Sequence, residues 1–260
     1  MVVDLHNHTP LCNHATGTLS EYIETAIKKN TKYFGIADHA PMDFDPQYRM
    51  SFSQMQEYEN SILEAKQKYA LDITLLLGYE VDFIEGLVDK RVLEADVDYL
   101  IGSVHFLGEW GFDNPEFIGR YKEQNIDELW QKYFKAIESM AKTKQFQIAG
   151  HLDLMKVFKF MPTKPVVDFA KDALLAIKEA NMALELNVAG YRKPVGEPYP
   201  SRELLEEAFA LNIPITFASD AHEPKQVGLF SDEIVKFAKD AGYKEAVYFE
   251  SKKMKFIELN

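Results

Sequence analysis

Histidine is the residue type that offers the most chemistry in this chain. The 260 residues contain seven histidines, and two of them stand in the segment His6-Asn7-His8. In an extended segment alternate side chains point to the same side, so both imidazoles can face one metal ion. Asp220 and His222 repeat this spacing. A single histidine is usually a surface or core residue, so the positions of the whole set must decide.

Seven short apolar runs alternate with stretches of helical periodicity, which is typical of βα units around a buried parallel sheet. We expect strands at Val2–Leu5, Tyr33–Ala37, Ile73–Tyr79, Tyr99–Val104, Phe146–Ala149, Ala183–Val188 and Ile213–Ala218. We expect helices at about 18–30, 53–70, 86–95, 125–144, 165–180, 201–211 and 229–241. Thr18 and Glu21 have the spacing of a capping box at the start of the first helix. The pattern predicts an α/β fold with residues 1–260 in one domain.

Three segments depart from this alternation. Residues 42–50 follow directly after Pro41 and contain Pro46, so they should form a loop over one end of the sheet. Residues 108–124 are similarly irregular. Residues 246–259 predict two short strands around Ser251-Lys252-Lys253, outside the repeating pattern.

Side chains that can bind metal follow six of the seven predicted strands. In chain order they are His6 and His8, His39, Glu80, His105, His151, and the pair Asp220 and His222, while His14 lies in the first loop. Strand–helix alternation alone does not choose between a closed barrel and an open sheet. In barrels, however, chemistry gathers at the C-terminal ends of the strands. The set therefore predicts a barrel with a metal site at that end.

Nine candidate ligands imply more than one metal ion, so we expect two or three divalent cations. Imidazole suits zinc and iron, and carboxylates suit harder cations such as manganese. Glu80 can bridge two ions with its two oxygens. Such a cluster can hold both the attacking and the leaving oxygen of a displacement.

Six motifs resemble those of the polymerase-and-histidinol-phosphatase (PHP) superfamily. They are Asp-Leu-His6-Asn-His8-Thr, Ala-Asp-His39, Gly-Tyr-Glu80, Gly-Ser-Val-His105, Ala-Gly-His151 and Ser-Asp220-Ala-His222. Within the superfamily, Gly-Ser-Val-His-Phe and Asn187-Val-Ala-Gly-Tyr-Arg-Lys-Pro-Val-Gly-Glu-Pro-Tyr-Pro are similar to the histidinol-phosphate phosphatase branch. The resemblance covers the chain from residue 2 to about residue 228.

The resemblance implies a distorted (β/α)7 TIM-like barrel, in agreement with the seven strands found from the apolar pattern. It also implies a trinuclear metal site. One ion would be bound by His6, His8, Glu80 and Asp220, a second by Glu80, His105 and His151, and a third by His14, His39 and His222. The implied reaction is hydrolysis of L-histidinol phosphate to L-histidinol and phosphate, a step of histidine biosynthesis.

Hydrolysis of a phosphate monoester requires stabilisation of the charge on the transferring phosphoryl oxygens. We expect a metal-bound hydroxide to attack phosphorus, with Asp220, His222 and Glu80 nearest the reaction. Arg192, in the loop after the sixth strand, is the first candidate for a bidentate phosphate contact, and Lys156 is the second.

Loose candidates for contacts with the amino group and imidazole of the substrate are Asp43, Asp82, Phe83 and Tyr191. Glu185 and Asn187 are further candidates, because they line the end of the sixth strand. The single cysteine, Cys12, is predicted to be a bystander, because a metal hydroxide needs no second nucleophile. The aromatic residues Trp110, Phe112, Phe158 and Phe160 are predicted to be structural.

Composition limits the partners. The net charge of −12 and the lack of a basic patch argue against nucleic acid, whereas a small phosphate ester can still bind where metal ions reverse the local field. One cysteine excludes an intrachain disulfide and fits a reducing compartment, so we expect the cytoplasm. The N-terminus lacks the pattern of a secretory signal, and no apolar run reaches the ~18 residues of a membrane span.

Three other functions remain open at this point. A phosphoesterase of the same superfamily could act on nucleotides or other small phosphate esters. A scaffold protein could keep the metals without catalysis. Amidohydrolases also begin with His-x-His on a barrel, but they require a bridging lysine and eight strands, and this chain has Glu80 at the bridging position.

Overall fold

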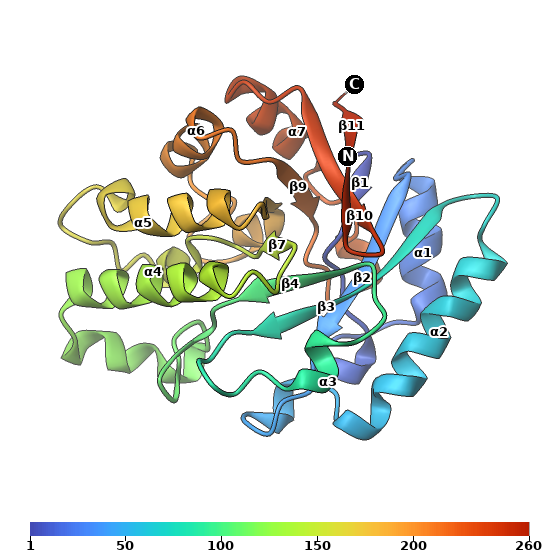
Figure 1. The fold of residues 1–260 in the computed structure, drawn as a ribbon, viewed down its shortest axis with the longest axis horizontal. Helices are drawn as coiled ribbons and strands as arrows, with labels where there is room; N and C mark the ends of the chain where they lie inside the picture. Colours follow the sequence, from blue (N-terminus) through green and yellow to red (C-terminus); the bar gives the residue numbers. More distant parts are fainter. Residues whose placement is uncertain (260) are drawn as a thin grey trace.

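The computed structural model describes residues 1–259, which form a nearly closed barrel of parallel strands surrounded by helices (Figure 1). Seven strands pair in the order β1-β2-β3-β4-β7-β8-β9. Their bounds are β1 Val3–Asp4, β2 Tyr33–His39, β3 Thr74–Asp82, β4 Tyr99–Ser103, β7 Ile148–Ala149, β8 Ala183–Asn187 and β9 Ile215–Ala218. The distorted (β/α)7 barrel predicted from the sequence is confirmed.

The last strand returns to the first and closes the barrel. The amide of Leu5 donates to the carbonyl of Phe217 over 2.9 Å, and the amide of His8 donates to the carbonyl of Ala221 over 3.0 Å. The amide of Asp220 donates to His6 over 2.7 Å. The two short segments that carry His6, His8 and Asp220 are thereby fixed side by side.

Seven helices cover the outside of the barrel, within a residue or two of the predicted positions except for a shorter α3 (Figure 1). They are α1 Leu19–Lys28, α2 Met55–Lys68, α3 Lys90–Leu93, α4 Ile126–Lys142, α5 Val166–Glu179, α6 Arg202–Ala210 and α7 Ser231–Asp240. The capping box of α1 is present, because Glu21 accepts from the Thr18 amide and Thr18 Oγ1 accepts from the Glu21 amide. Within residues 1–259, none of these helices combines the length and the apolar character that crossing a bilayer needs.

Short elements complete the loops. The hairpin of β5 (Phe106–Leu107) and β6 (Trp110–Gly111) leads into the 3-10 helix η4 (Pro115–Glu123), in the segment predicted to be irregular. At the C-terminus, β10 (Glu245–Glu250) and β11 (Lys253–Glu258) form the predicted separate hairpin. Further 3-10 turns are η1 Pro10–Cys12, η2 Pro46–Tyr48, η3 Phe52–Gln54, η5 Leu154–Phe158, η6 Val188–Arg192 and η7 Pro224–Gln226.

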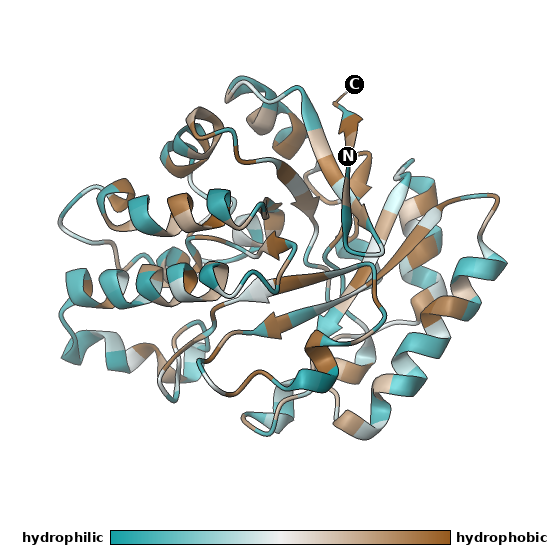
Figure 2. Cartoon of the chain, in the orientation of Figure 1, coloured by the Kyte–Doolittle hydropathy of each residue, from teal (hydrophilic) through white to brown (hydrophobic). Residues whose placement is uncertain are grey.

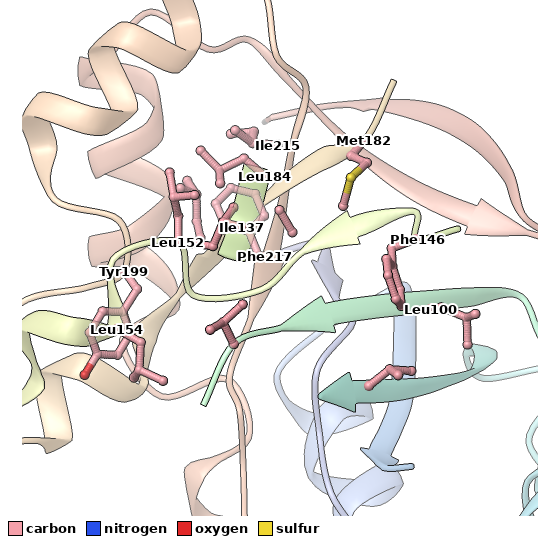
Figure 3. Packing of buried hydrophobic residues seen from close by; sticks show 14 of the residues in the cluster. Leu100, Ile137, Phe146, Leu152, Leu154, Met182, Leu184, Tyr199, Ile215 and Phe217 are labelled. Atoms are coloured by element: carbon pink, nitrogen blue, oxygen red, sulfur yellow. The ribbon is translucent and has the colours of Figure 1, made fainter. Parts of the chain in front are cut away.

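The main hydrophobic core lies between the strands and the helices. Figure 2 shows apolar residues concentrated on the strands and polar residues along the outer faces of the helices. Figure 3 shows part of this packing, where Ile137 of α4 lies near Leu184 of β8 and Phe217 of β9. The alternation of apolar strands and amphipathic helices in the sequence thus produces one continuous layer around the barrel.

A second apolar cluster fills the barrel interior at the N-terminal ends of the strands. It contains Val3, Leu5, Ala37, Leu76, Tyr99, Ile101, Ile148 and Ala183, together with Val247, Tyr248 and Phe249 of β10. Tyr99 occupies space left by two glycines, because a Cβ on Gly35 would lie 2.0 Å from its hydroxyl and a Cβ on Gly78 would lie 2.5 Å from its ring. The hairpin therefore seals one end of the barrel and leaves the other end to polar side chains.

Candidate metal centre

The cavity at the C-terminal ends of the strands has a volume of about 540 Å³. Its wall includes eight residues predicted to have a role in the site: His14, His39, Glu80, His105, His151, Arg192, Asp220 and His222. His6 and His8 are buried and contact Glu80 from inside the barrel. β2 and β3 extend further than predicted, so Glu80 lies within β3, paired with His39 at the end of β2.

The predicted ligands gather in three groups whose metal-binding atoms lie within 4.8 Å of one another. The groups are His6, His8 and Glu80; Glu80, His105 and His151; and His14, His39 and His222. Asp220 joins the first group through its Oδ1, which lies 3.3 Å from His8 Nε2. Glu80 belongs to two groups, with Oε2 near His6 and Oε1 near His151.

Buried carboxylates orient three of the imidazoles. Nδ1 of His6 lies 2.6 Å from Glu185, and Nδ1 of His8 lies 3.2 Å from Asp38. An ionised carboxylate only accepts hydrogen bonds, so each Nδ1 carries the proton and each Nε2 keeps a free lone pair. A third pair, His105 Nδ1 and Asp82 at 2.5 Å, follows the same arrangement.

Two further histidines are oriented by backbone carbonyls. Nδ1 of His14 lies 2.8 Å from the carbonyl of Cys12, and Nδ1 of His222 lies 3.2 Å from the carbonyl of Asp220. The effect on the ring is the same as that of a carboxylate, because a carbonyl also only accepts.

The free ring nitrogens fit a cation. Within residues 1–259, the buried Nε2 atoms of His6 and His8 have no hydrogen-bond partner. A buried polar atom without a partner is costly, and a metal ion would satisfy both lone pairs at once. The arrangement of imidazoles and carboxylates therefore forms clusters that can hold divalent metal ions.

The electrostatics of the first two groups favour positive charge. Burial opposes protonation of His8, but the nearby carboxylates of Asp220 and Asp38 outweigh burial and raise its pKa to about 9. Burial also opposes protonation of His105, yet Asp82 and Glu80 raise its pKa to about 10. A site that stabilises a proton in this way also stabilises a bound cation in its place.

The third group consists of imidazoles that remain neutral. Burial lowers the pKa of His39 to about 4, and the nearby histidines reinforce this effect. Burial and the charge of His8 hold the pKa of His222 well below its ordinary value. Burial likewise lowers the pKa of His14. Neutral imidazole is the form that binds metal, so these three rings need lose no proton.

Arg192 lies at the cavity wall as predicted, and Lys156 does not. Nη2 of Arg192 donates to the carbonyls of Ser219 and Asp220 over 2.9 and 2.8 Å. Its buried Nη1 has no partner within residues 1–259. Lys156 is buried away from the cavity, and its ammonium lies 2.9 Å from both Asp153 and Glu197. The geometry does not support a phosphate contact for Lys156, because these carboxylates already neutralise it.

The other loosely predicted substrate contacts are dispersed. Asp82 is at the wall but bound to His105 and Arg49. Asp43 is exposed, and Tyr191 packs against Phe230 with a centroid distance of 4.9 Å. Phe83 lines a different cavity beside the β5–β6 hairpin. The aromatic residues predicted to be structural, Trp110, Phe112, Phe158 and Phe160, pack in or against the main core.

Cys12 is buried next to the cluster. Its thiol lies within 4.8 Å of ligand atoms of His8 and His222 and donates to the carbonyl of Thr9 over 3.1 Å. Burial and the charge of Asp38 raise its pKa, so the thiol stays protonated. A protonated, hydrogen-bonded thiol is a poor nucleophile, which agrees with the predicted bystander role.

Asp38 and Arg49 were missed in the sequence, and Glu185 was named only as a residue at the end of the sixth strand, without a role in orienting a histidine. Asp38 precedes His39 directly, and Glu185 lies in the one strand without a predicted ligand. Both were visible as acids near strand ends, but their role requires knowing which histidine they face. Arg49 was not predicted at all. It is buried and binds Asp82 over 2.9 Å, so it fixes the carboxylate that orients His105.

Comparison with known proteins places this site in context. The sequence profile of the PHP domain matches residues 4–189. The probable histidinol-phosphatase of Deinococcus radiodurans is 41% identical over 96% of this chain and 97% of its own length. The histidinol-phosphatase of Bacillus subtilis is 30% identical, and the match covers 86% of this chain and 95% of that one.

Two solved structures share the fold. A histidinol phosphate phosphatase from Lactococcus lactis, crystallised with zinc, L-histidinol and phosphate, superposes with a TM-score of 0.81 at 21% identity, covering 97% of this chain and 98% of that one. A structure from Listeria monocytogenes superposes with a TM-score of 0.79 at 24% identity, covering 88% and 99%. At these identities the likeness establishes the barrel architecture.

Proposed function

The chain belongs to the PHP domain family, and from this membership and the geometry of the cavity we propose that it is a metal-dependent phosphomonoesterase that hydrolyses L-histidinol phosphate. One observation carries the proposal. Nine candidate ligands, which lie in or after six of the seven strands, gather around one cavity, and Glu80 belongs to two of the groups. Curated relatives that span nearly the whole chain are histidinol-phosphatases, which favours this substrate over nucleotides.

We assign two or three divalent cations to the three groups. His6, His8, Glu80 and Asp220 would hold the first, Glu80, His105 and His151 the second, and His14, His39 and His222 the third. The seven imidazoles suit zinc and iron, and the carboxylates of Glu80 and Asp220 suit manganese. Bound cations supply positive charge for the phosphoryl oxygens and lower the pKa of a water molecule at the cluster.

The protein positions the ester and controls protons. Arg192 can donate from its free Nη1 to a phosphoryl oxygen, and its Nη2 remains fixed on two backbone carbonyls. Glu185 and Asp38 hold protons on Nδ1 of His6 and His8, so Nε2 is the nitrogen of each ring that is left to bind a cation. The histidine charges keep the pKa of Asp220 well below its ordinary value despite burial, so Asp220 stays ionised.

The substrate is a small phosphate ester. A cavity of about 540 Å³ lies in the size range of small-molecule sites. The net charge of −12 disfavours long polyanions, whereas a monoester can reach a locally cationic centre.

The test is phosphate release by the purified protein from L-histidinol phosphate, nucleoside monophosphates and simple alkyl phosphates. Each substrate is assayed with added zinc, manganese or a chelator. We expect a strong preference for L-histidinol phosphate that chelation abolishes and metal restores. Equal turnover of the whole panel would overturn the substrate assignment, and turnover unaffected by chelation would overturn the metal mechanism.

A further inference from the structure

Most charged side chains on the cavity wall already have a partner within the protein. Asp82 binds Arg49 and His105. Asp45 lies 3.5 Å from Arg49 Nη2. Glu80 and Asp220, the two acids of the metal centre, are surrounded by imidazoles. These groups are therefore not free to recognise a substrate.

Asp113 is the exception among the carboxylates of this wall. It lines the cavity, and within residues 1–259 its side chain has no ion pair and no hydrogen bond under the usual distance limits. It belongs to the turn between β6 and η4. None of the sequence motifs pointed to it, because it lies in the irregular segment after the fourth strand.

The backbone around Asp113 is fixed relative to the metal centre. The amide of the preceding residue, Phe112, donates to the carbonyl of His105 over 3.2 Å. The following residue, Asn114, caps η4 by accepting from the Glu116 amide over 2.9 Å. Asp113 is thus tied on one side to a candidate metal ligand and on the other to a short helix. Its place in the cavity is set before any ligand arrives.

The charged side chains of the cavity wall that have no partner belong to two loops and have opposite signs. Arg192 offers a free Nη1, and Lys193 beside it has no ion pair or side-chain hydrogen bond within residues 1–259. Asp113 is carried by a different loop. The cavity thus receives free donors for an anion from one loop and a free carboxylate that can accept from a cation from another.

This charge pattern matches a phosphate monoester that also carries an ammonium group. We propose that Asp113 binds the primary ammonium of the substrate and selects phosphate monoesters with an amino group over those without one. The inference rests on the proposed function for the identity of the reacting group, the phosphate. It adds the residue that recognises the rest of the molecule.

The state of the free carboxylate supports this assignment. Burial raises the pKa of Asp113, and the charges of His105 and Lys193 oppose the increase. A partly buried carboxylate that has no cation in hydrogen-bond contact is destabilised, and a bound ammonium would relieve this cost. Phe117 and Phe106 line the same cavity and offer apolar surface to an imidazole ring.

The experiment compares Asp113→Asn with Asp72→Asn. Both changes remove one negative charge, but Asp72 is exposed and is not part of the cavity wall. Steady-state kinetics are measured with L-histidinol phosphate and with its analogue that lacks the amino group, 3-(imidazol-4-yl)propyl phosphate. A second pair, phosphoethanolamine and ethyl phosphate, isolates the ammonium from the imidazole.

We expect Asp113→Asn to lower kcat/KM for the amino-bearing esters by about tenfold to a hundredfold, mainly through KM, because a hydrogen bond to a charged group is lost. Turnover of the two esters without an amino group should change less than about twofold, which would show that the metal centre is intact. Asp72→Asn should change turnover of none of the four esters. Isothermal titration of L-histidinol into the protein should show the same loss of affinity without turnover.

Two results would overturn the inference. An equal loss of kcat/KM for esters with and without the amino group would make Asp113 a general component of the site. No loss for either kind would show that Asp113 does not contact the substrate. The proposed function is judged separately by the wild-type protein. If that protein did not prefer L-histidinol phosphate but Asp113→Asn still weakened phosphoethanolamine turnover alone, the function would fail and the inference would stand.

Discussion

The two ends of the barrel interior are built from the same strands but have opposite character. On β2, Ala37 faces the apolar cluster, and His39, two residues later, faces the metal centre. On β3, Leu76 and Glu80 have the same relation at a spacing of four residues. Alternate residues of a strand share one face, so each strand changes from apolar to polar along a single face of the barrel.

On β8 the same change occurs between Ala183 and Glu185. The comparison shows how the fold separates stability from chemistry. The N-terminal half of the interior excludes water around Tyr99 and is sealed by β10. The C-terminal half gathers buried charges, which are costly unless they are paired or bind metal. We expect substitutions at the polar end to affect activity and metal binding, and substitutions at the apolar end to affect the free energy of unfolding.

The largest expected effect is that of Glu80→Gln. Glu80 belongs to two metal-binding groups, so one change should weaken both. Because outer-shell changes alone cost 10–100-fold, we expect phosphatase activity to fall by more than about a thousandfold. Circular dichroism should show a folded protein. Near-normal turnover by this variant would break the contrast between the two ends.

The matching change at the apolar end is Phe249→Ala. Phe249 is 2% exposed in the interior cluster, and its truncation should lower the free energy of unfolding by about 3–5 kcal/mol. Urea denaturation measures this loss, and kcat of the folded variant should stay within about twofold of the parent. Phe256→Ala in the same hairpin is the control, because Phe256 is 60% exposed and should matter little. Loss of kcat without loss of stability would contradict the separation.

A smaller effect at the polar end is expected from Glu185→Gln. Glu185 accepts from His6 Nδ1 with one oxygen and from the His151 amide with the other. An amide side chain would place an N–H group against one of these donors. We predict a 10- to 100-fold loss of metal affinity, measured by competition with a chelator. Metal affinity equal to that of the parent would show that Glu185 is not required to orient His6.

The smallest effect concerns the fit of Tyr99. Gly35→Ala places a methyl group against the Tyr99 hydroxyl, and overpacking should cost about 1–3 kcal/mol of stability. Tyr99→Phe removes that hydroxyl, so the double variant should lose less than the sum of the two single changes. Thermal and urea unfolding of the four proteins completes this cycle. Strict additivity would mean that the glycine is not required by the tyrosine.

Periodicity and spacing in the sequence were sufficient for the elements and for the ligand types. Each of the seven predicted strands is present, because short apolar runs between amphipathic helices can be buried only as a parallel sheet. The capping box of α1 was readable because both partners lie within four residues. The predicted ligands were recognisable for a similar local reason, since all of them except His14 lie at or near a strand end.

Only the tertiary structure decided which groups face each other. The pairing of His6 with Glu185 joins residues 179 positions apart, and no local pattern encodes such a contact. The same reason explains why Lys156, predicted at the phosphate, instead meets Asp153 and Glu197. It also explains why Asp113 was not recognised, because a carboxylate becomes distinctive only when every neighbour with which it could pair has been placed. Local sequence determines the type and spacing of the groups, whereas closure of the barrel determines which of them remain free.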